Sequence, residues 1–163
     1  MNRVMVSASS ENNAEVPLPA WSARFKSYAK KVLARLGRNN WDISVLLCDD
    51  GTISALNSRY RGKDQATDVL SFSLNEGEVF PPHEVPHERS LPGDIVISLD
   101  TMRENARRFN IGEDEELRRL LIHGILHLDG MDHRTNGKTE PMLQLQERIL
   151  TELAEECILG RNV

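Results

Sequence analysis

Cysteine is scarce in this chain of 163 residues, which contains only Cys48 and Cys157, far apart in the sequence. This scarcity disfavours a disulfide-stapled secreted domain, and the two cysteines do not form a metal-type pair. We therefore expect two buried, reduced thiols, and a disulfide is the less favoured alternative.

Long apolar runs and an excess of basic residues are also missing. No stretch reaches the roughly 18 apolar residues that a membrane-spanning helix needs, and the first residues, MNRVMVSASSENN, lack the apolar segment of a signal peptide. We therefore expect a cytoplasmic protein with no membrane partner. The formal net charge of −5 disfavours a nucleic-acid coat protein that is basic all over, although it leaves room for a local basic surface.

The chain is long enough for a hydrophobic core, and its length favours a single domain, residues 1–163. Apolar periodicity predicts strands at about 3–8, 41–47, 68–74 and 94–98 and helices at about 18–36, 52–60, 101–109, 114–128 and 139–159. Asp100 is a candidate N-cap for the third helix. Residues 75–92 are rich in Pro, Glu and His and are expected to form a long excursion. These segments predict an α+β or mixed α/β fold in which about five helices cover a small sheet.

The stretch HGILHLDGMDH contains three of the five histidines, His123, His127 and His133. The first two are four residues apart and therefore lie on one face of a helix. Gly130 permits a sharp turn that can bring His133 back as a third ligand. Three neutral imidazoles leave the fourth position of a zinc ion open to water, which is the arrangement of catalytic sites and lowers the pKa of that water to about 7. The spacing therefore predicts a metal site.

Gly124 follows the first histidine, where HExxH peptidases carry the glutamate that acts as general base. A glycine cannot take a proton, so peptide hydrolysis would need a base from elsewhere, and we interpret the small residue as leaving space beside the metal. Asp129 and Asp132 are candidates to orient a ligand histidine through a carboxylate. Asp132 is also a candidate to act on the water, with a plain turn residue as the alternative.

Basic residues supply the second clue. Arg59, Arg61 and Lys63 surround a glycine turn and form a candidate phosphate anchor, because the arginine fork suits phosphate oxygens; ordinary surface residues are the alternative. The helix at 18–36 carries a further basic face, which is either solvated or faces RNA: Arg24, Lys30, Lys31, Arg35 and Arg38.

His83 and His87 are also four apart, but the prolines around them exclude a regular helix, and we expect a solvated loop.

Three blocks, HGILHLDGMDH, NSRYRGKDQATDVLSFSL and LPGDIVIS, closely resemble the YbeY family of bacterial metal-dependent endoribonucleases. Met131 stands where that family usually has an aromatic residue. The resemblance implies a four-stranded mixed sheet covered by helices, similar to the zincin peptidases. It implies zinc, or another divalent transition metal, on His123, His127 and His133, and a functional role for Arg61. It also implies single-strand-specific RNA cleavage in 16S rRNA 3′-end processing and ribosome quality control, on or near the ribosome.

Two other hypotheses stay open at this stage. A metal-dependent peptidase fits the histidine spacing, and a ribosome-binding factor with a structural metal fits the family without requiring catalysis. For the endoribonuclease, the nucleophile is either metal-bound hydroxide or the 2′-hydroxyl of the RNA, and the sequence does not choose between them. We conjecture that single strands are preferred because a double helix holds its backbone too rigidly for in-line attack by the 2′-hydroxyl.

Overall fold

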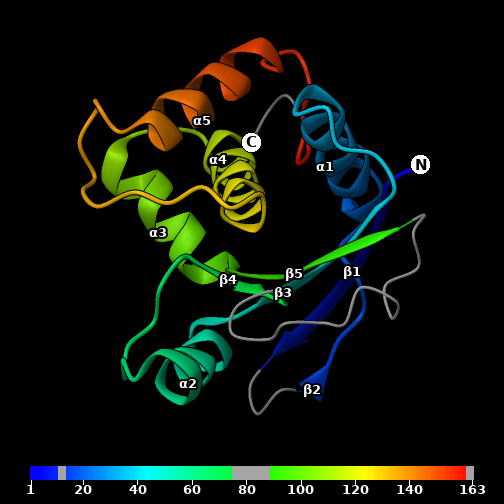
Figure 1. Ribbon diagram of the computed structural model, residues 1–163. Coiled ribbons are helices and arrows are strands. Elements are labelled where there is room, and N and C mark those ends of the chain that lie inside the picture. The colour runs from blue at the N-terminus through cyan, green and yellow to red at the C-terminus, as the bar shows by residue number, and fades with distance from the viewer. Residues whose placement is uncertain (11–13, 75–88, 161–163) are drawn as a thin grey trace.

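The computed structural model describes residues 1–10, 14–74 and 89–160 (Figure 1). Its five-stranded sheet has the order β2-β1-β3-β5-β4, in which β1, β3 and β5 run parallel and β2 and β4 are antiparallel edge strands. The strands are β1 (Arg3–Ser10), β2 (Ala14–Glu15), β3 (Trp41–Cys48), β4 (Val69–Ser73) and β5 (Ser90–Ser98). All four expected strands are present and the sheet is mixed. The additional strand β2 has two residues, too few for an alternating pattern to reveal.

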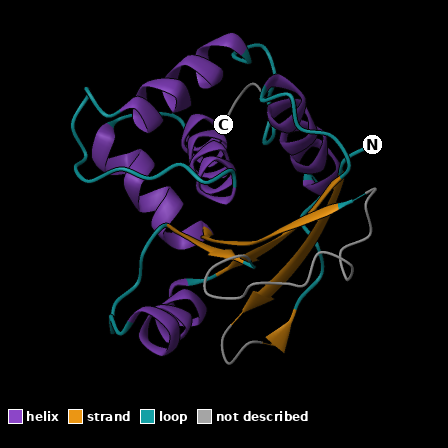
Figure 2. Cartoon of the chain, viewed as in Figure 1, coloured by secondary structure: helices purple, strands orange, loops and turns teal. Residues whose placement is uncertain are grey.

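Five helices cover the two faces of the sheet unequally (Figure 2). They are α1 (Ser22–Arg35), α2 (Asp50–Arg61), α3 (Leu99–Phe109), α4 (Glu113–Leu128) and α5 (Pro141–Glu152). Four of them lie on one face, and α2 lies alone on the other. The α+β class is therefore confirmed, and within residues 1–10, 14–74 and 89–160 α2 is the single helix on its face of the sheet.

The helix α4 lies at the centre of the larger layer and contacts β4, β5, α1, α3 and α5. It is apolar around most of its circumference, as expected for a helix packed on several sides: Leu117, Leu120, Leu121, Ile122, Ile125 and Leu126 are all buried. Each such side chain contributes about 1.5–3 kcal/mol when it leaves water. A smaller apolar cluster under α2 includes Cys48, Ile53 and Val96. The helix α4, which carries two of the candidate ligands, is thus packed against five other elements.

The N-cap expected for α3 is wrong. The helix begins at Leu99, and the Ser98 hydroxyl accepts a hydrogen bond from the backbone N–H of Thr101. Asp100 lies in the first turn, where its carboxylate accepts from the backbone N–H of Asp50 at 3.1 Å. Serine is as good a cap as aspartate, so residue type alone gave no reason to prefer Asp100 over Ser98.

The last helix ends at Glu152, earlier than the expected 159. Beyond it, the buried carboxylate of Asp114 accepts from the backbone N–H groups of Ile158 and Leu159, both at 2.7 Å. This contact turns the chain back and buries Ile158 in the core. Cys157 is only partly buried in this turn, whereas Cys48 is buried, and both are free thiols, so the disulfide alternative is wrong.

Of the five basic residues predicted on the face of the first helix, four are engaged within the chain, and one of these, Arg38, lies just beyond the end of α1. Lys31 pairs with Glu156 at 2.7 Å, Arg35 pairs with Glu152, and Arg38 pairs with Asp129 at 2.6 Å. Arg24 donates to the carbonyl of Ile158 at 2.7 Å. Because acceptors of this chain already occupy these cations, the structure disfavours the RNA-facing interpretation of this helix.

Two further expectations concern the segment at residues 75–92 and the absence of membrane-spanning helices. Most of the excursion expected at 75–92, with His83 and His87, lies outside the described residues, and residues 90–92 begin β5. Among the described residues, no helix is both long enough and apolar enough to cross a membrane.

Candidate metal centre

The three histidines of the motif meet at the C-terminal end of α4. His123 and His127 lie one turn apart on α4, and the helix ends before Gly130, whose φ of +92° suits glycine and turns the chain as predicted. His133 then returns toward the helix. One nitrogen of each ring lies within 4.8 Å of the others. The sequence prediction that these three residues come together is confirmed.

In all three histidines the same ring nitrogen, Nδ1, makes a hydrogen bond to an oxygen. The Nδ1 atoms of His123, His127 and His133 contact Gln146 Oε1 at 2.7 Å, the Met131 carbonyl at 3.0 Å and the Thr135 carbonyl at 2.9 Å. An oxygen acceptor requires that Nδ1 carry the proton, so in the neutral ring Nε2 keeps its lone pair. Each histidine therefore offers Nε2 as a ligand atom, and its Nδ1–H is held by a neighbour, as in protein metal sites.

The two nitrogens on α4 are close enough to share one cation. His123 Nε2 and His127 Nε2 are 3.1 Å apart, and two lone pairs at this distance repel each other unless a positive charge lies between them. Burial lowers the pKa of both imidazoles, and the neighbouring histidines lower them further. Both effects favour neutral rings, which is the form that binds a metal. The donor set fits zinc.

The prediction that Asp129 or Asp132 orients a ligand histidine is wrong, because other oxygens contact the three Nδ1 atoms. Asp129 pairs with Arg38, and Asp132 accepts a hydrogen bond at 2.8 Å from the backbone N–H of His133 rather than from its ring. The side chain that binds a histidine ring is Gln146, on α5, which sequence reasoning missed. A signal existed, because Gln146 lies between Met142 and Ile149 on the apolar stripe of α5, where a buried polar residue needs a partner.

Gly124 has a packing role that differs from the one we inferred. A Cβ atom at this position would lie 2.8 Å from Ile95 Cγ2 and 3.1 Å from Ile95 Cδ1, on the adjacent strand β5. The glycine therefore lets α4 approach the sheet closely, and the space freed by its missing side chain is filled by Ile95. A glutamate at 124, as in the peptidases, would have to displace that buried isoleucine.

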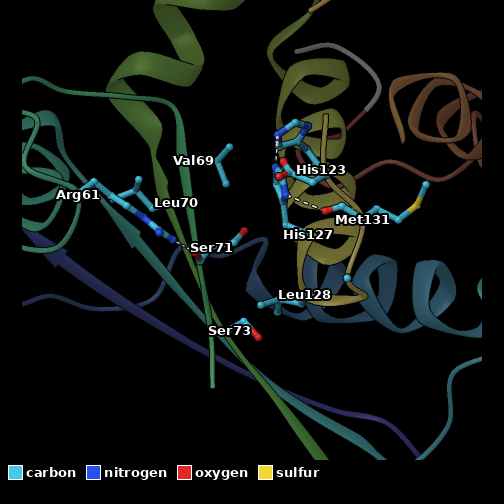
Figure 3. Close-up of a pocket in the computed structure, with 11 residues that line it drawn as sticks. Arg61, Val69, Leu70, Ser71, Ser73, His123, His127, Leu128 and Met131 are labelled. Carbon is cyan, nitrogen blue, oxygen red and sulfur yellow. Dashed lines mark hydrogen bonds between the residues drawn. The ribbon is translucent and has the colours of Figure 1, made fainter. Parts of the chain in front are cut away.

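A cavity of about 520 Å³, here called the metal pocket, opens between α4, β4 and the end of α2 (Figure 3). It is lined by Arg61, Val69, Leu70, Ser71, Ser73, His123, His127, Leu128, Gly130, Met131 and Asp132. Arg61 extends from α2 to β4 and donates to the Ser71 carbonyl at 2.7 Å. Of the three basic residues predicted as a phosphate anchor, Arg61 lines this pocket, whereas Arg59 and Lys63 do not.

The fold and site define a class: an α+β protein with an open three-histidine centre, of the kind found in metal-dependent hydrolases. The sequence model of the family described as Endoribonuclease YbeY matches residues 7–154. The chain belongs to this family.

Individual relatives agree with this assignment. The chain is 46% identical over 140 residues to the endoribonuclease YbeY of Treponema denticola, covering 86% of this chain and 88% of that protein. It is 38% identical over 155 residues to the endoribonuclease YbeY of Persephonella marina, covering 94% of each. The solution structure of TM1509 from Thermotoga maritima is similar, with a TM-score of 0.55, 27% identity and coverage of 95% of this chain and 91% of that one.

Proposed function

We propose that this protein is a zinc-dependent endoribonuclease that cleaves single-stranded RNA at the metal pocket. We further propose that it acts in the cytoplasm, on or near the ribosome, in 16S rRNA 3′-end processing and ribosome quality control. The observation that carries the proposal is the convergence of three histidine side chains, two of which line the same pocket as Arg61. The names of its relatives support RNA as the substrate.

The residues of the chain have separable roles in this proposal. His123, His127 and His133 would hold zinc, which when bound would supply Lewis-acid chemistry at a phosphodiester. Arg61 would bind the nonbridging oxygens of that phosphate, since a guanidinium fork matches their geometry. The carboxylate of Asp132 lines the same pocket and would accept a proton from the attacking group. The packing of Gly124 against Ile95 leaves no room for a peptidase base at that position.

The first test compares RNA cleavage with metal content. Zinc-loaded protein should cut a single-stranded oligoribonucleotide faster than the same RNA in a duplex, and His123→Ala and His127→Ala should lose both zinc and cleavage while remaining folded by circular dichroism. A folded histidine variant that cuts RNA at the wild-type rate would refute the proposal. A zinc-loaded wild-type protein that cuts no RNA would favour the ribosome-binding alternative, and cleavage of a peptide library would favour the peptidase.

Arg61→Ala separates phosphate binding from metal binding. Because hydrogen bonds to charged groups contribute about 1.5–3 kcal/mol, cleavage should fall roughly ten- to a hundredfold, while elemental analysis should still find about one zinc per chain. Arg103→Ala is the matched control, since Arg103 is a half-exposed arginine on α3 that pairs with Asp100 at 3.7 Å and does not line the metal pocket. Loss of zinc from Arg61→Ala would contradict the assigned role.

A further inference from the structure

Two aromatic rings lie on the other face of β4, behind the metal pocket. Tyr60, in the last turn of α2, contacts Phe72 of β4 edge to face, with ring centroids 5.4 Å apart and an interplanar angle of 65°. Tyr60 is 55% exposed, which is high for a side chain of its size. Phe72 packs with the apolar cluster under α2, whereas its neighbours Ser71 and Ser73 line the metal pocket. Because side chains alternate along a strand, the aromatic pair and the histidines lie on opposite faces of the sheet.

Each ring of this aromatic pair, Tyr60 and Phe72, has an arginine over it. The guanidinium carbon of Arg59 lies 5.2 Å from the centre of the Tyr60 ring, and that of Arg61 lies 5.4 Å from the centre of the Phe72 ring. Both distances are within the range of cation–π contacts. Arg61 also binds the Ser71 carbonyl and lines the metal pocket. The guanidinium of Arg61 therefore lies where the two faces of β4 meet.

A second cavity, of about 470 Å³, adjoins the aromatic pair. Its lining is mostly apolar where α2 meets the sheet, with Leu46, Leu56, Tyr60, Phe72 and Val96 among its apolar members and Ser7, Ser44 and Asp94 as its polar ones. Since β4 is an edge strand of the described sheet, the two cavities lie on either side of this one strand, and Arg61 lines one of them while its guanidinium contacts the Phe72 ring that lines the other.

We propose that Tyr60 and Phe72, with Arg59 and Arg61, form a stacking subsite for one unpaired base of the RNA. The base would stack on the exposed Tyr60 ring, and the phosphate beside it would be held by Arg61 on the way to the metal pocket. Aromatic faces combined with cationic side chains are the means by which proteins bind single-stranded nucleic acid without reading its sequence. This inference rests on the proposed function and adds to it the feature of the substrate that the site recognises.

The subsite gives single-strand preference a structural cause. In a duplex, each base is paired and stacked on its neighbours, so it would first have to leave the helix to reach Tyr60, at a cost of a few kcal/mol when a nucleotide is flipped out. For an unpaired base this free-energy cost is much smaller. This cause is independent of the flexibility of the backbone at the cleaved bond.

The test uses a short 2′-O-methyl oligoribonucleotide that carries 2-aminopurine, whose fluorescence is quenched when it stacks on an aromatic ring. The oligonucleotide should bind the zinc-loaded protein with quenching, and Tyr60→Ala should weaken binding about 5- to 150-fold and remove the quenching. Tyr60→Phe should retain both. Intact oligonucleotide is confirmed by gel electrophoresis after each measurement, and zinc content should be unchanged in both variants.

Phe109→Ala is the matched control, because Phe109 is an exposed aromatic residue with an arginine, Arg108, 5.8 Å from its ring centre, and it does not line the metal pocket. This variant should bind like the wild type. If Tyr60→Ala binds with wild-type affinity and quenching while the wild type cleaves RNA, the subsite is wrong and the proposed function stands. If the wild type neither binds nor cleaves RNA, both fail. An equal loss of binding in Phe109→Ala would also overturn the assignment.

Discussion

The side chain of Gln146 has its two polar ends on different partners. Its Oε1 atom contacts His123 Nδ1 at 2.7 Å, and its Nε2 atom donates to Glu147 at 3.4 Å. Glu147 in turn accepts from Arg119 at 3.0 Å, and Arg119 lies one turn before His123 on α4. This chain of hydrogen bonds fixes which end of the Gln146 amide faces His123. It thereby fixes which nitrogen of the His123 ring is available to a metal.

Gln146→Leu should weaken zinc binding about 10- to 100-fold, because the variant leaves the Nδ1–H of His123 without its acceptor and no longer fixes the tautomer. Competition with a chromophoric chelator measures this affinity. Gln146→Glu should bind zinc at least as tightly as the wild type, since a carboxylate also accepts the proton and makes the ligand more basic.

Gln144→Leu is the control for this prediction. Gln144 lies on the same helix two residues away, but its side chain is exposed, so its replacement should leave zinc affinity unchanged. If Gln146→Leu bound zinc as tightly as Gln144→Leu, the hydrogen bond would not be what prepares His123 for the metal.

Sequence reasoning grouped the three candidate ligands but missed Gln146, which binds one of their rings, and the reason is distance along the chain. His123, His127 and His133 lie in eleven residues, so helix periodicity and one glycine turn were enough to group them. Gln146 is 23 residues from His123 and meets it only because α5 packs on α4. The carboxylates near in sequence, Asp129 and Asp132, proved to have other partners.

At the scale of elements, the contact of α4 with β5 places the metal centre relative to the sheet. Ile95 is fully buried, and its branched Cβ leaves it little freedom to move aside. The absence of a side chain at Gly124 therefore permits the close approach of α4, which carries two candidate ligands, to β5.

Gly124→Ala should destabilise the protein although alanine is the better helix former. Overpacking against Ile95 costs about 1–3 kcal/mol, and alanine recovers about 1 kcal/mol of helix propensity, so we expect a net loss of about 1 kcal/mol, seen as a lower midpoint of urea denaturation. Gly51→Ala is the control on α2, where the nearest atom to a new Cβ would be Asp49 Oδ1 at 3.8 Å. That variant should be neutral or stabilised. A Gly124→Ala protein as stable as Gly51→Ala would show that the contact relaxes freely.

Element boundaries were predictable only where local signals were sufficient. Apolar residues located β1, β3, β4 and β5, and apolar stripes or helix-end signals such as caps, glycines and an acidic first turn located the five described helices. The stripe of the last helix continued through Leu153 and Cys157 and predicted an overlong α5. The helix ends early because Asp114, some 44 residues before Ile158 in the chain, binds the backbone of the final turn, and no local pattern contains that contact.

For the whole molecule, the candidate metal centre joins three separate parts of the chain. Two candidate ligands come from α4, the third from the turn that follows it, and the residue that orients His123 comes from α5. A bound ion would therefore stabilise the folded state relative to an unfolded chain in which these parts are apart. Folding stability and metal affinity should be coupled.

Zinc should raise the melting temperature by an amount that depends on its concentration. At free zinc about 100 times the dissociation constant, linkage adds about 2.7 kcal/mol, or about 5–10 °C for a protein of this size. Differential scanning calorimetry with and without a chelator measures the shift. His133→Ala should lose most of it, and an equal shift in that variant would place the stabilising zinc somewhere else.

The contact between Gly124 and Ile95 also limits what this scaffold can become by mutation. The histidine spacing is the same as in a zinc peptidase, and the short motif lacks only the glutamate at position 124, so a single substitution at that position is the shortest path between the two activities in sequence. In three dimensions that step is blocked, because a glutamate at 124 has to enter a space already filled by Ile95 of β5. A route to a peptidase must first shrink residue 95 or move the helix away from the sheet. The two chemistries are neighbours in sequence but are separated by a repacked core.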